Sequence, residues 1–274
     1  MSGPAPAAAA TSNGDLPAIV AYAQRERART LLKNAFPRRR VRLLLTRTPE
    51  DFDAAFKTNL IDAALVDVTG AQEDTWRVAT RAREYPSAPF FGLASLRLAD
   101  GPALAQCAAY EFADVLVDGV DDEVARDLVL NAGFSLRFAR ALETPPPSLG
   151  LAHPIQQAAW RFVVSHAGRP VRTSTLAQVL RVTREHLSRS FSAGNAPNLK
   201  RIIDLVRIVS AAELAKNPGY DLRDIAGILD FASSSHLSST AMRVVGTKPA
   251  SLARLRTVDL IDRFTKGHGR SRGP

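Results

Sequence analysis

Four polar side chains within one short segment have the chemistry needed to read the edges of nucleic-acid bases. They are Arg184, Glu185, Ser188 and Arg189. An arginine can donate two hydrogen bonds to guanine, and a glutamate can accept one from the amino group of cytosine. Leu187 and Phe191 lie four residues apart, so on a helix they share an apolar face and turn the polar group away from it. The segment therefore predicts a helix with one buried face and one face free to contact bases.

A second polar group, made of serines, lies nearer the C-terminal end. Its members are Ser234, Ser235, Ser238 and Ser239. Serine hydroxyls both donate and accept hydrogen bonds, so they discriminate bases poorly. Each polar group lies on the second of two short amphipathic helices joined by a tight turn, at 175–182 with 183–191 and at 222–229 with 233–240. This arrangement is typical of helix-turn-helix units, whose second helix enters the major groove of DNA. Arg172, Arg201 and Lys248 complete the set of expected DNA-binding residues.

The positive charge of the chain lies in its C-terminal part. Residues 1–150 carry 17 Lys and Arg against 19 Asp and Glu, whereas residues 151–274 carry 19 against 8. A field of this sign attracts a polyanion, and neutralised phosphates supply most non-specific affinity for DNA. Charge alone does not distinguish DNA from a membrane surface as the partner. The charge could also serve only to keep the protein soluble. Its coincidence with the two helix pairs favours double-stranded DNA.

Patterns of catalytic or metal-binding residues are absent from the sequence. The five histidines are His153, His166, His186, His236 and His268. They are scattered without metal-ligand spacing, and there is no nucleophile elbow or phosphate-binding glycine loop. We therefore expect no enzyme activity, no catalytic residues, no metal and no cofactor. The single cysteine, Cys107, is expected to be a buried structural thiol. Without a long apolar run or a signal peptide, a cytoplasmic protein is expected.

Short apolar runs alternate with amphipathic stretches in the N-terminal half. The expected strands are 18–22, 41–45, 63–67, 90–94 and 115–117, and the expected helices are 25–36, 49–60, 73–84, 100–110 and 121–142. Thr48 is expected to cap the helix that begins at Pro49. Five such alternations predict a parallel sheet covered on both faces, which is the α/β flavodoxin-like doubly wound class.

The order and spacing of these elements resemble the receiver domain of bacterial two-component response regulators over residues 15–142. The resemblance implies an acidic pair that holds Mg²⁺, a phosphoacceptor aspartate, a Thr or Ser and a Lys. Asp67 stands at the phosphoacceptor position, but residues 22–24 are Tyr-Ala-Gln at the acidic pair, Ala94 replaces the Thr or Ser, and Asp118 replaces the Lys. Phosphoryl transfer to a carboxylate needs a neutralising cation. We therefore expect a pseudo-receiver in which Asp67 is a vestigial phosphoacceptor.

Residues 153–256 resemble the C-terminal DNA-binding domain of the AraC/XylS family of bacterial transcription regulators. That family holds two helix-turn-helix units apart by one long helix, for which residues 198–216, with apolar side chains on one face, are the candidate. The matching residues are Arg207, Ala211, Leu214, Ile225, Ala226, Phe231, Gly246 and Pro249. The departures are Asp230 for a glycine, Ala241 for a phenylalanine and Ala253 for an arginine. The resemblance implies an all-α domain that binds DNA through two units.

The expected organisation follows from these patterns. It comprises a disordered tail (1–14), a receiver-like domain (15–142), a proline-rich linker (143–152), an AraC-type DNA-binding domain (153–256) and a basic tail (257–274), disordered from 266. The sequence thus predicts a sequence-specific DNA-binding transcription regulator. The alternatives are a protein-interaction adaptor with a degenerate DNA-binding half, or a response regulator phosphorylated on Asp67. Expected partners are double-stranded DNA, a second copy of the chain and RNA polymerase or a signalling protein, without a membrane.

Overall fold

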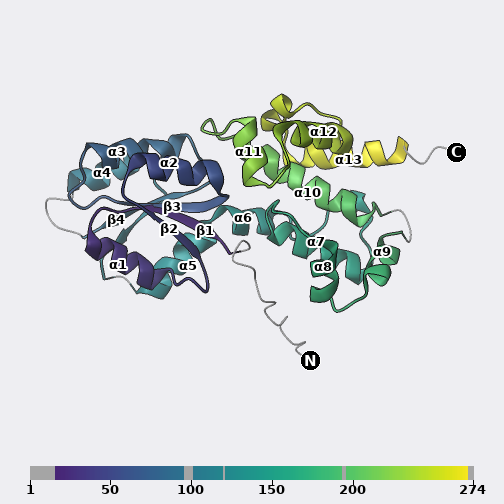
Figure 1. Cartoon of the computed structure of the whole chain (residues 1–274), viewed down its shortest axis with the longest axis horizontal. Coiled ribbons are helices and arrows are strands. Elements are labelled where there is room, and N and C mark those ends of the chain that lie inside the picture. Colours follow the sequence, from purple (N-terminus) through teal and green to yellow (C-terminus); the bar gives the residue numbers. More distant parts are fainter. Residues whose placement is uncertain (1–15, 96–100, 120, 193–195, 271–274) are drawn as a thin grey trace.

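The computed structural model describes residues 16–95, 101–119, 121–192 and 196–270, with side chains up to Gly267. An α/β half and a helical half lie beside each other (Figure 1). The expected tail at 1–14 lies outside the described residues.

Five parallel strands form the sheet of the N-terminal half. They are β1 (Ala18–Tyr22), β2 (Arg42–Thr46), β3 (Ile61–Asp67), β4 (Phe90–Ala94) and β5 (Asp114–Val117). Their order across the sheet is β2-β1-β3-β4-β5. This is the order of flavodoxin-like doubly wound sheets, so the predicted fold class is confirmed. Every residue of β1 and β3 is buried, as expected for central parallel strands with helices on both faces.

Helices cover both faces of this sheet. One face carries α1 (Glu26–Ala35) and α5 (Asp122–Ala132), and the other carries α2 (Pro49–Thr58), α3 (Glu73–Ala79) and α4 (Gly101–Ala109) (Figure 1). The short 3₁₀ helix η1 (Thr80–Arg83) follows α3. Thr48 caps α2 as predicted, since its hydroxyl accepts from the Asp51 amide at 3.1 Å. Cys107 is buried against the sheet, also as predicted.

The helix predicted over 121–142 is in fact two helices. α5 ends at Ala132, and α6 (Phe134–Ala141) begins after Gly133. The Ser135 amide donates to the buried carboxylate of Asp62 at 2.7 Å. The first turn of α6 is therefore bonded to a side chain of β3. This contact redirects the chain, and the rings of Phe134 and Phe138 pack in the core of the C-terminal half.

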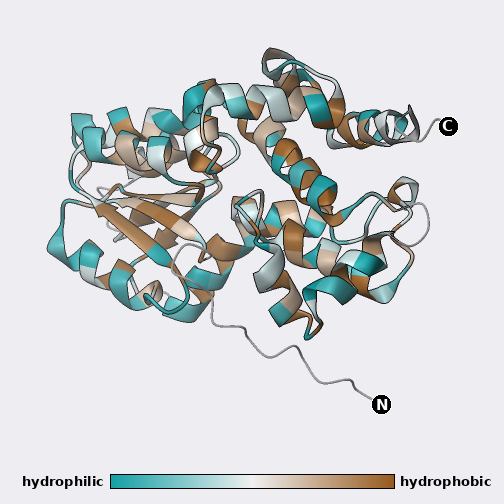
Figure 2. Cartoon of the chain, turned by 45° about the vertical axis from the view of Figure 1, so that its right-hand side comes forward, coloured by the Kyte–Doolittle hydropathy of each residue, from teal (hydrophilic) through white to brown (hydrophobic). Residues whose placement is uncertain are grey.

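The C-terminal half is all-α, as predicted. Its helices are α7 (Pro154–Ser165), α8 (Thr173–Val179), α9 (Arg184–Ser192), α10 (Leu199–Leu214), α11 (Leu222–Ile228), α12 (Ser234–Val245) and α13 (Thr257–Arg270), with the short η4 (Pro249–Arg254) before the last. The expectation of a single apolar face on α10 is wrong. α10 lies between the two helix pairs (Figures 1 and 2). It is buried on most sides, and its buried residues include Asp204 and Ser210. The Ser210 hydroxyl is satisfied by donating to the Ala167 carbonyl at 2.7 Å.

A helix replaces most of the basic tail expected after Arg256. α13 covers 257–270 and closes the C-terminal core with Leu260, Ile261 and Phe264. The tail expectation is therefore wrong for these residues, because apolar side chains one helical turn apart give them a face to bury. Residues 271–274 lie outside the described part of the chain.

The proline-rich segment 143–152 packs against the helical half instead of bridging open solvent. It contains η3 (Pro147–Leu149), and both Leu149 and Leu151 are buried. Just before it, the Leu142 carbonyl accepts from the indole of the buried Trp160 at 2.6 Å. These contacts hold the segment to the helical half. As a domain boundary it stays a prediction.

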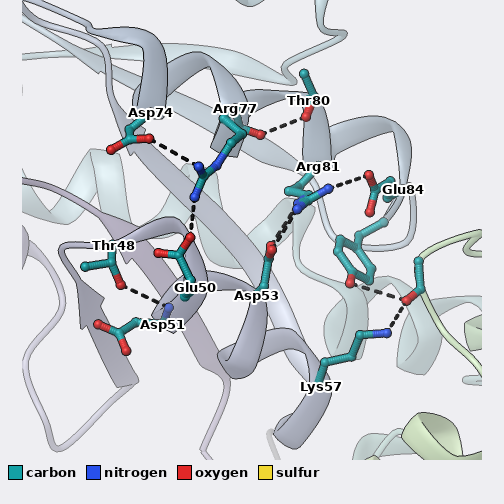
Figure 3. A network of polar contacts seen from close by, with 12 residues as sticks. Thr48, Glu50, Asp51, Asp53, Lys57, Asp74, Arg77, Thr80, Arg81 and Glu84 are labelled. Carbon is teal, nitrogen blue, oxygen red and sulfur yellow. Dashed lines mark hydrogen bonds and ion pairs between the residues drawn. The ribbon is translucent and has the colours of Figure 1, made fainter.

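Polar contacts join the two halves at the end of α2. Lys57, at the end of α2 (Figure 3), donates to the Gly219 carbonyl and to the Asp224 carboxylate, each at 2.5 Å. Beside them, Tyr85 packs against Tyr220, with ring centroids 4.8 Å apart. The ion pair of Arg81 with Asp53, at 2.7 Å, braces α2 against η1 (Figure 3). The start of α11 is therefore docked on the α/β half.

A buried carboxylate makes a second junction. Asp62 in β3 accepts from the Ala18 amide at 2.8 Å as well as from Ser135. Arg169, in the loop between α7 and α8, reaches the same carboxylate at 3.4 Å. One side chain thus ties β1, α6 and the first helix pair together.

Candidate nucleic-acid interface

The first helix pair exposes the predicted base-reading residues. Leu187 and Phe191 of α9 are buried, as predicted, while the four polar residues Arg184, Glu185, Ser188 and Arg189 are exposed. The turn that joins α8 to α9 places Arg181 in the left-handed region, with φ of 55°. The side-chain amide of Gln156 donates to the Ser190 carbonyl at 2.8 Å and so fixes α9 to α7. The polar face is thus presented by a helix that is anchored from behind.

The first turn of α9 has a defined charge arrangement. Hydrogen bonds from its own backbone amide and from the Thr183 hydroxyl lower the pKa of Glu185, so it is a carboxylate at neutral pH. Thr183 also accepts from the His186 amide at 3.1 Å, which caps the helix. Arg189 lies one turn on, with its Nε 3.4 Å from the Glu185 carbonyl. The Glu185 carboxylate therefore accepts hydrogen bonds at the start of α9, whereas Arg184 and Arg189 are exposed to solvent.

The second helix pair holds its serines against its own backbone. The Ser238 hydroxyl donates to the Ser234 carbonyl at 2.8 Å, and that of Ser239 donates to the His236 carbonyl at 3.1 Å. Ser235 and Ser239 are exposed, and Ser234 and Ser238 are half-buried. Because their protons are used within the helix, the hydroxyls of Ser238 and Ser239 can offer a base only acceptor lone pairs.

The start and the turn of the second pair are fixed by polar contacts. Asp221 caps α11, with its carboxylate accepting from the Asp224 amide at 2.8 Å. Arg207 of α10 lies over the Phe231 ring at 3.9 Å and donates to the Asp230 carbonyl at 3.1 Å. The resemblance had marked Arg207 and Phe231 without a contact between them, so this pairing is a finding of the structure.

The remaining expected residues are more dispersed. Arg172 precedes α8 and Lys248 precedes η4, and both are exposed. Arg201 is only half-exposed, since its guanidinium lies 5.1 Å from the centre of the Phe264 ring of α13. α9 and α12 lie on either side of α10 (Figure 1). The two helix pairs therefore present separate surfaces.

At the carboxyl edge of the sheet, the predicted phosphoacceptor position is occupied by an ion pair. Arg25, which follows β1, donates from Nε to one oxygen of Asp67 at 2.8 Å and from Nη2 to the other at 2.5 Å. The Asp67 side chain is 3 % exposed. Burial raises the pKa of Asp67, and the Arg25 guanidinium opposes that shift. Arg25 was not predicted as this partner, although an arginine directly after Gln24 was a visible signal.

Among the described residues, the ends of the neighbouring strands carry no lysine and no acidic pair. Asp118 follows β5 and is 5 % exposed, with one oxygen 3.6 Å from Arg27 Nε. Neither of its oxygens has a hydrogen-bond partner among the described residues, and the same holds for the buried hydroxyl of Ser95. The Ser95 amide donates to the Thr69 hydroxyl at 2.9 Å. Asp67 is thus neutralised by a protein guanidinium, and the described residues at this edge include no acidic pair that could hold a metal ion.

The described residues give no sign of a metal centre or of a membrane span. No three His, Cys, Asp or Glu side chains gather as metal ligands would. Over the same part of the chain, no helix has both the length and the apolar character needed to cross a bilayer.

No protein-family model matches the sequence, and comparison with curated proteins finds no match either. Among solved structures, full-length FixJ from B. japonicum is similar at 10 % identity, covering 88 % of this chain and 98 % of its own, with a TM-score of 0.38. A response regulator from Thermotoga maritima matches at 15 % identity over 43 % of this chain and 97 % of its own, with a TM-score of 0.37.

A third solved structure is a response regulator protein from Burkholderia pseudomallei with a phosphorylated aspartic acid, a calcium ion and citrate. It matches at 16 % identity over 64 % of this chain and 98 % of its own, with a TM-score of 0.36. The strand order of the sheet itself establishes the class of the N-terminal fold.

Proposed function

We propose that this chain is a sequence-specific DNA-binding transcription regulator of the AraC/XylS type, with a receiver-like half that works without aspartyl phosphorylation. The observation that carries the proposal is the exposed polar face of α9 over the buried Leu187 and Phe191. A helix built in this way can enter a major groove without disturbing its own core. The excess of basic residues in 151–274 supports the same reading.

The two helix pairs have unequal roles in this proposal. Arg184 and Arg189 can donate bidentately to guanine, so α9 is the principal reader of sequence. The hydroxyls of α12 are bonded to their own helix, which suits contacts with phosphate or with groove shape better than base discrimination. Arg172 and Lys248 supply further charge for phosphates.

The ion pair between Arg25 and Asp67 supports regulation without phosphate. Both carboxylate oxygens already accept from a guanidinium, so a phosphoryl group would have to displace an internal cation. The nearby Asp118 would add repulsion, since a second negative charge stands where a receiver carries lysine. The regulator itself performs no reaction and needs no cofactor.

We include a homodimer in the proposal. Val124 and Leu128 lie one turn apart on α5, and their side chains are 61 % and 42 % exposed. Two apolar side chains in this arrangement suit a helix-to-helix contact with a second copy. Sedimentation of the full-length protein tests this part, and a monomer at all concentrations would remove it.

The test of the proposed function is a selection of binding sites by the full-length protein from a pool of random DNA duplexes. We expect one enriched motif, and we expect Arg189→Ala to lose that enrichment. Lys33→Ala is the matched control, because it removes one exposed positive charge from the α/β half and should leave the motif intact. Retention of duplexes without any enriched motif would reject sequence-specific regulation and support the adaptor.

A further inference from the structure

A cavity of about 430 Å³ lies where the two halves of the molecule meet. Its wall is built from Ser87 of the α/β half, from α6, and from the end of α10. The volume is in the range of sites that hold small organic molecules. The base-reading faces of α9 and α12 do not contribute to it, so it is separate from the surface proposed to bind DNA.

The inner wall of the cavity is apolar. Phe134 and Phe138 of α6, with ring centroids 5.8 Å apart, line it together with Leu142. All three side chains are otherwise buried in the C-terminal core. Such a surface accepts a flat apolar body, since its burial removes apolar area from water on both sides.

The rim of the cavity carries an excess positive charge. Glu213 is matched by Lys216, whose Nζ lies 2.7 Å from its carboxylate, and it also accepts from the Thr257 hydroxyl at 3.2 Å. Arg137 donates to the carbonyl of Ser87 at 2.5 Å. In the described part of the chain Arg137 has no carboxylate partner, so its charge is left to attract an anion.

We propose that this cavity is a binding site for an amphipathic organic anion, with a flat apolar body against the phenylalanines and one carboxylate at Arg137. The apolar wall selects the body, and the uncompensated guanidinium selects the sign of the head group. The residues proposed to contact DNA do not line this cavity, so DNA binding does not require the cavity to be occupied.

Occupancy of the site is coupled to the junction between the halves. The Ser87 amide donates to the side-chain oxygen of the buried Asn217 at 2.8 Å, and both residues line the cavity. A ligand there touches the α/β half and α10 at once, so its affinity depends on how the halves are placed. By linkage, the ligand shifts that placement in turn.

Calorimetric titration of the full-length protein tests the site, with three probes that share one ring system. These are the naphthoate anion, neutral naphthamide and cationic naphthylmethylamine. We expect naphthoate to bind saturably at one site per chain, and Arg137→Gln to weaken it about tenfold while leaving naphthamide unchanged. Equal binding of the anion and the amine would overturn the assignment of an anionic ligand.

A blocking variant tests the location. Ala141→Trp places a large ring at the exposed edge of the cavity and should abolish binding, whereas Ala105→Trp, at an exposed alanine of α4, should not. Both variants are first checked for wild-type circular dichroism, and Arg137→Gln still decides the question if the first does not fold. Full binding by a folded Ala141→Trp, or no saturable binding of any probe, would refute the site. None of these readouts involves DNA, so they stand apart from the proposed function.

Discussion

The guanidinium of Arg25 holds both carboxylate oxygens of Asp67 in a two-pronged pair at the carboxyl edge of the sheet. Because β1 and β3 are neighbours, Arg25, in the loop that follows β1, reaches Asp67, the last residue of β3. The positive charge that neutralises Asp67 is therefore supplied by a side chain of the protein itself.

Phosphate analogues should have no effect at Asp67. Beryllofluoride with Mg²⁺ should leave the melting temperature and the oligomeric state unchanged. The carboxylate is already neutralised, and residues 22–24 at the end of β1, where a receiver carries its acidic pair, are Tyr-Ala-Gln. Differential scanning calorimetry and sedimentation check this result. A magnesium-dependent stabilisation that Asp67→Asn abolishes would show a working receiver instead.

Asp67→Asn itself should lower the free energy of unfolding by about 1–2 kcal/mol, since it removes the carboxylate charge that pairs with the partly exposed Arg25. DNA binding should stay near the wild-type level. Urea unfolding and a binding titration separate the two effects, and a loss of DNA affinity without a loss of stability would contradict the expectation.

Arg189→Ala should weaken binding to the selected site by about 1–3 kcal/mol and relax the preference at one base pair. The double change Ser238→Ala with Ser239→Ala should matter less, because the hydroxyls are bonded to carbonyls of α12. Fluorescence anisotropy with the selected duplex and with single-base variants measures both. Specificity dominated by the serine pair would reverse our ranking of the two helix pairs.

Asp62→Ala should cost about 3–5 kcal/mol of unfolding free energy. The change leaves the Ala18 and Ser135 amides without their acceptor and removes the partner of Arg169. Glu143→Ala, at an exposed carboxylate, is the control and should be nearly neutral. Equal stability of the two variants in urea would show that Asp62 does not organise the junction.

The stability of the protein should fall in alkali partly through Cys107. Burial raises the pKa of its thiol to about 11 from an ordinary value near 9, so the unfolded chain releases this proton first. Between about pH 9 and 11 the folded state binds more protons than the unfolded state, and stability drops as pH rises. Cys107→Ala should reduce this slope in urea titrations at stepped pH, and an unchanged slope would exclude the thiol.

The turns of the C-terminal half offer a matched pair of substitutions. Asp230 has φ of 53°, and Asp230→Gly should stabilise by up to about 1 kcal/mol because glycine adopts this region without strain. Gly246 has φ of 63° with open space around it, so Gly246→Ala should cost about 1 kcal/mol from the backbone alone. Thermal unfolding measures both, and shifts of the same sign would contradict the explanation.

Local sequence patterns were sufficient to predict the positions of most helices and strands. They were insufficient to predict the contacts between residues far apart in the sequence. Each strand is a short apolar run, so its position could be predicted from the residues themselves. The break at Gly133 could not, because it depends on the carboxylate of Asp62 in a distant strand. Likewise, the sequence predicted that only one face of α10 is buried. The burial of Asp204 could not be predicted, because it depends on an ion pair with Arg243 of α12, at 2.9 Å.

In the candidate sites, too, the features set by local spacing were predictable and those set by long-range contacts were not. The exposed face of α9 follows from the spacing of Leu187 and Phe191, so it was predictable. The pairing of Arg25 with Asp67 requires β1 and β3 to be adjacent, which only the assembled sheet provides.

The packing of α6 decides how this chain could be recombined with others. Phe134, Phe138 and Leu142 complete the core of the helical half, although they precede the run of prolines. A chimaera joined at the prolines would transplant the helical half without these side chains and expose its core to water. A junction at Gly133 keeps these three side chains with the helical half. A foreign sheet would then have to replace Asp62, which holds Ser135 and Arg169, and Leu60, which packs in the same core.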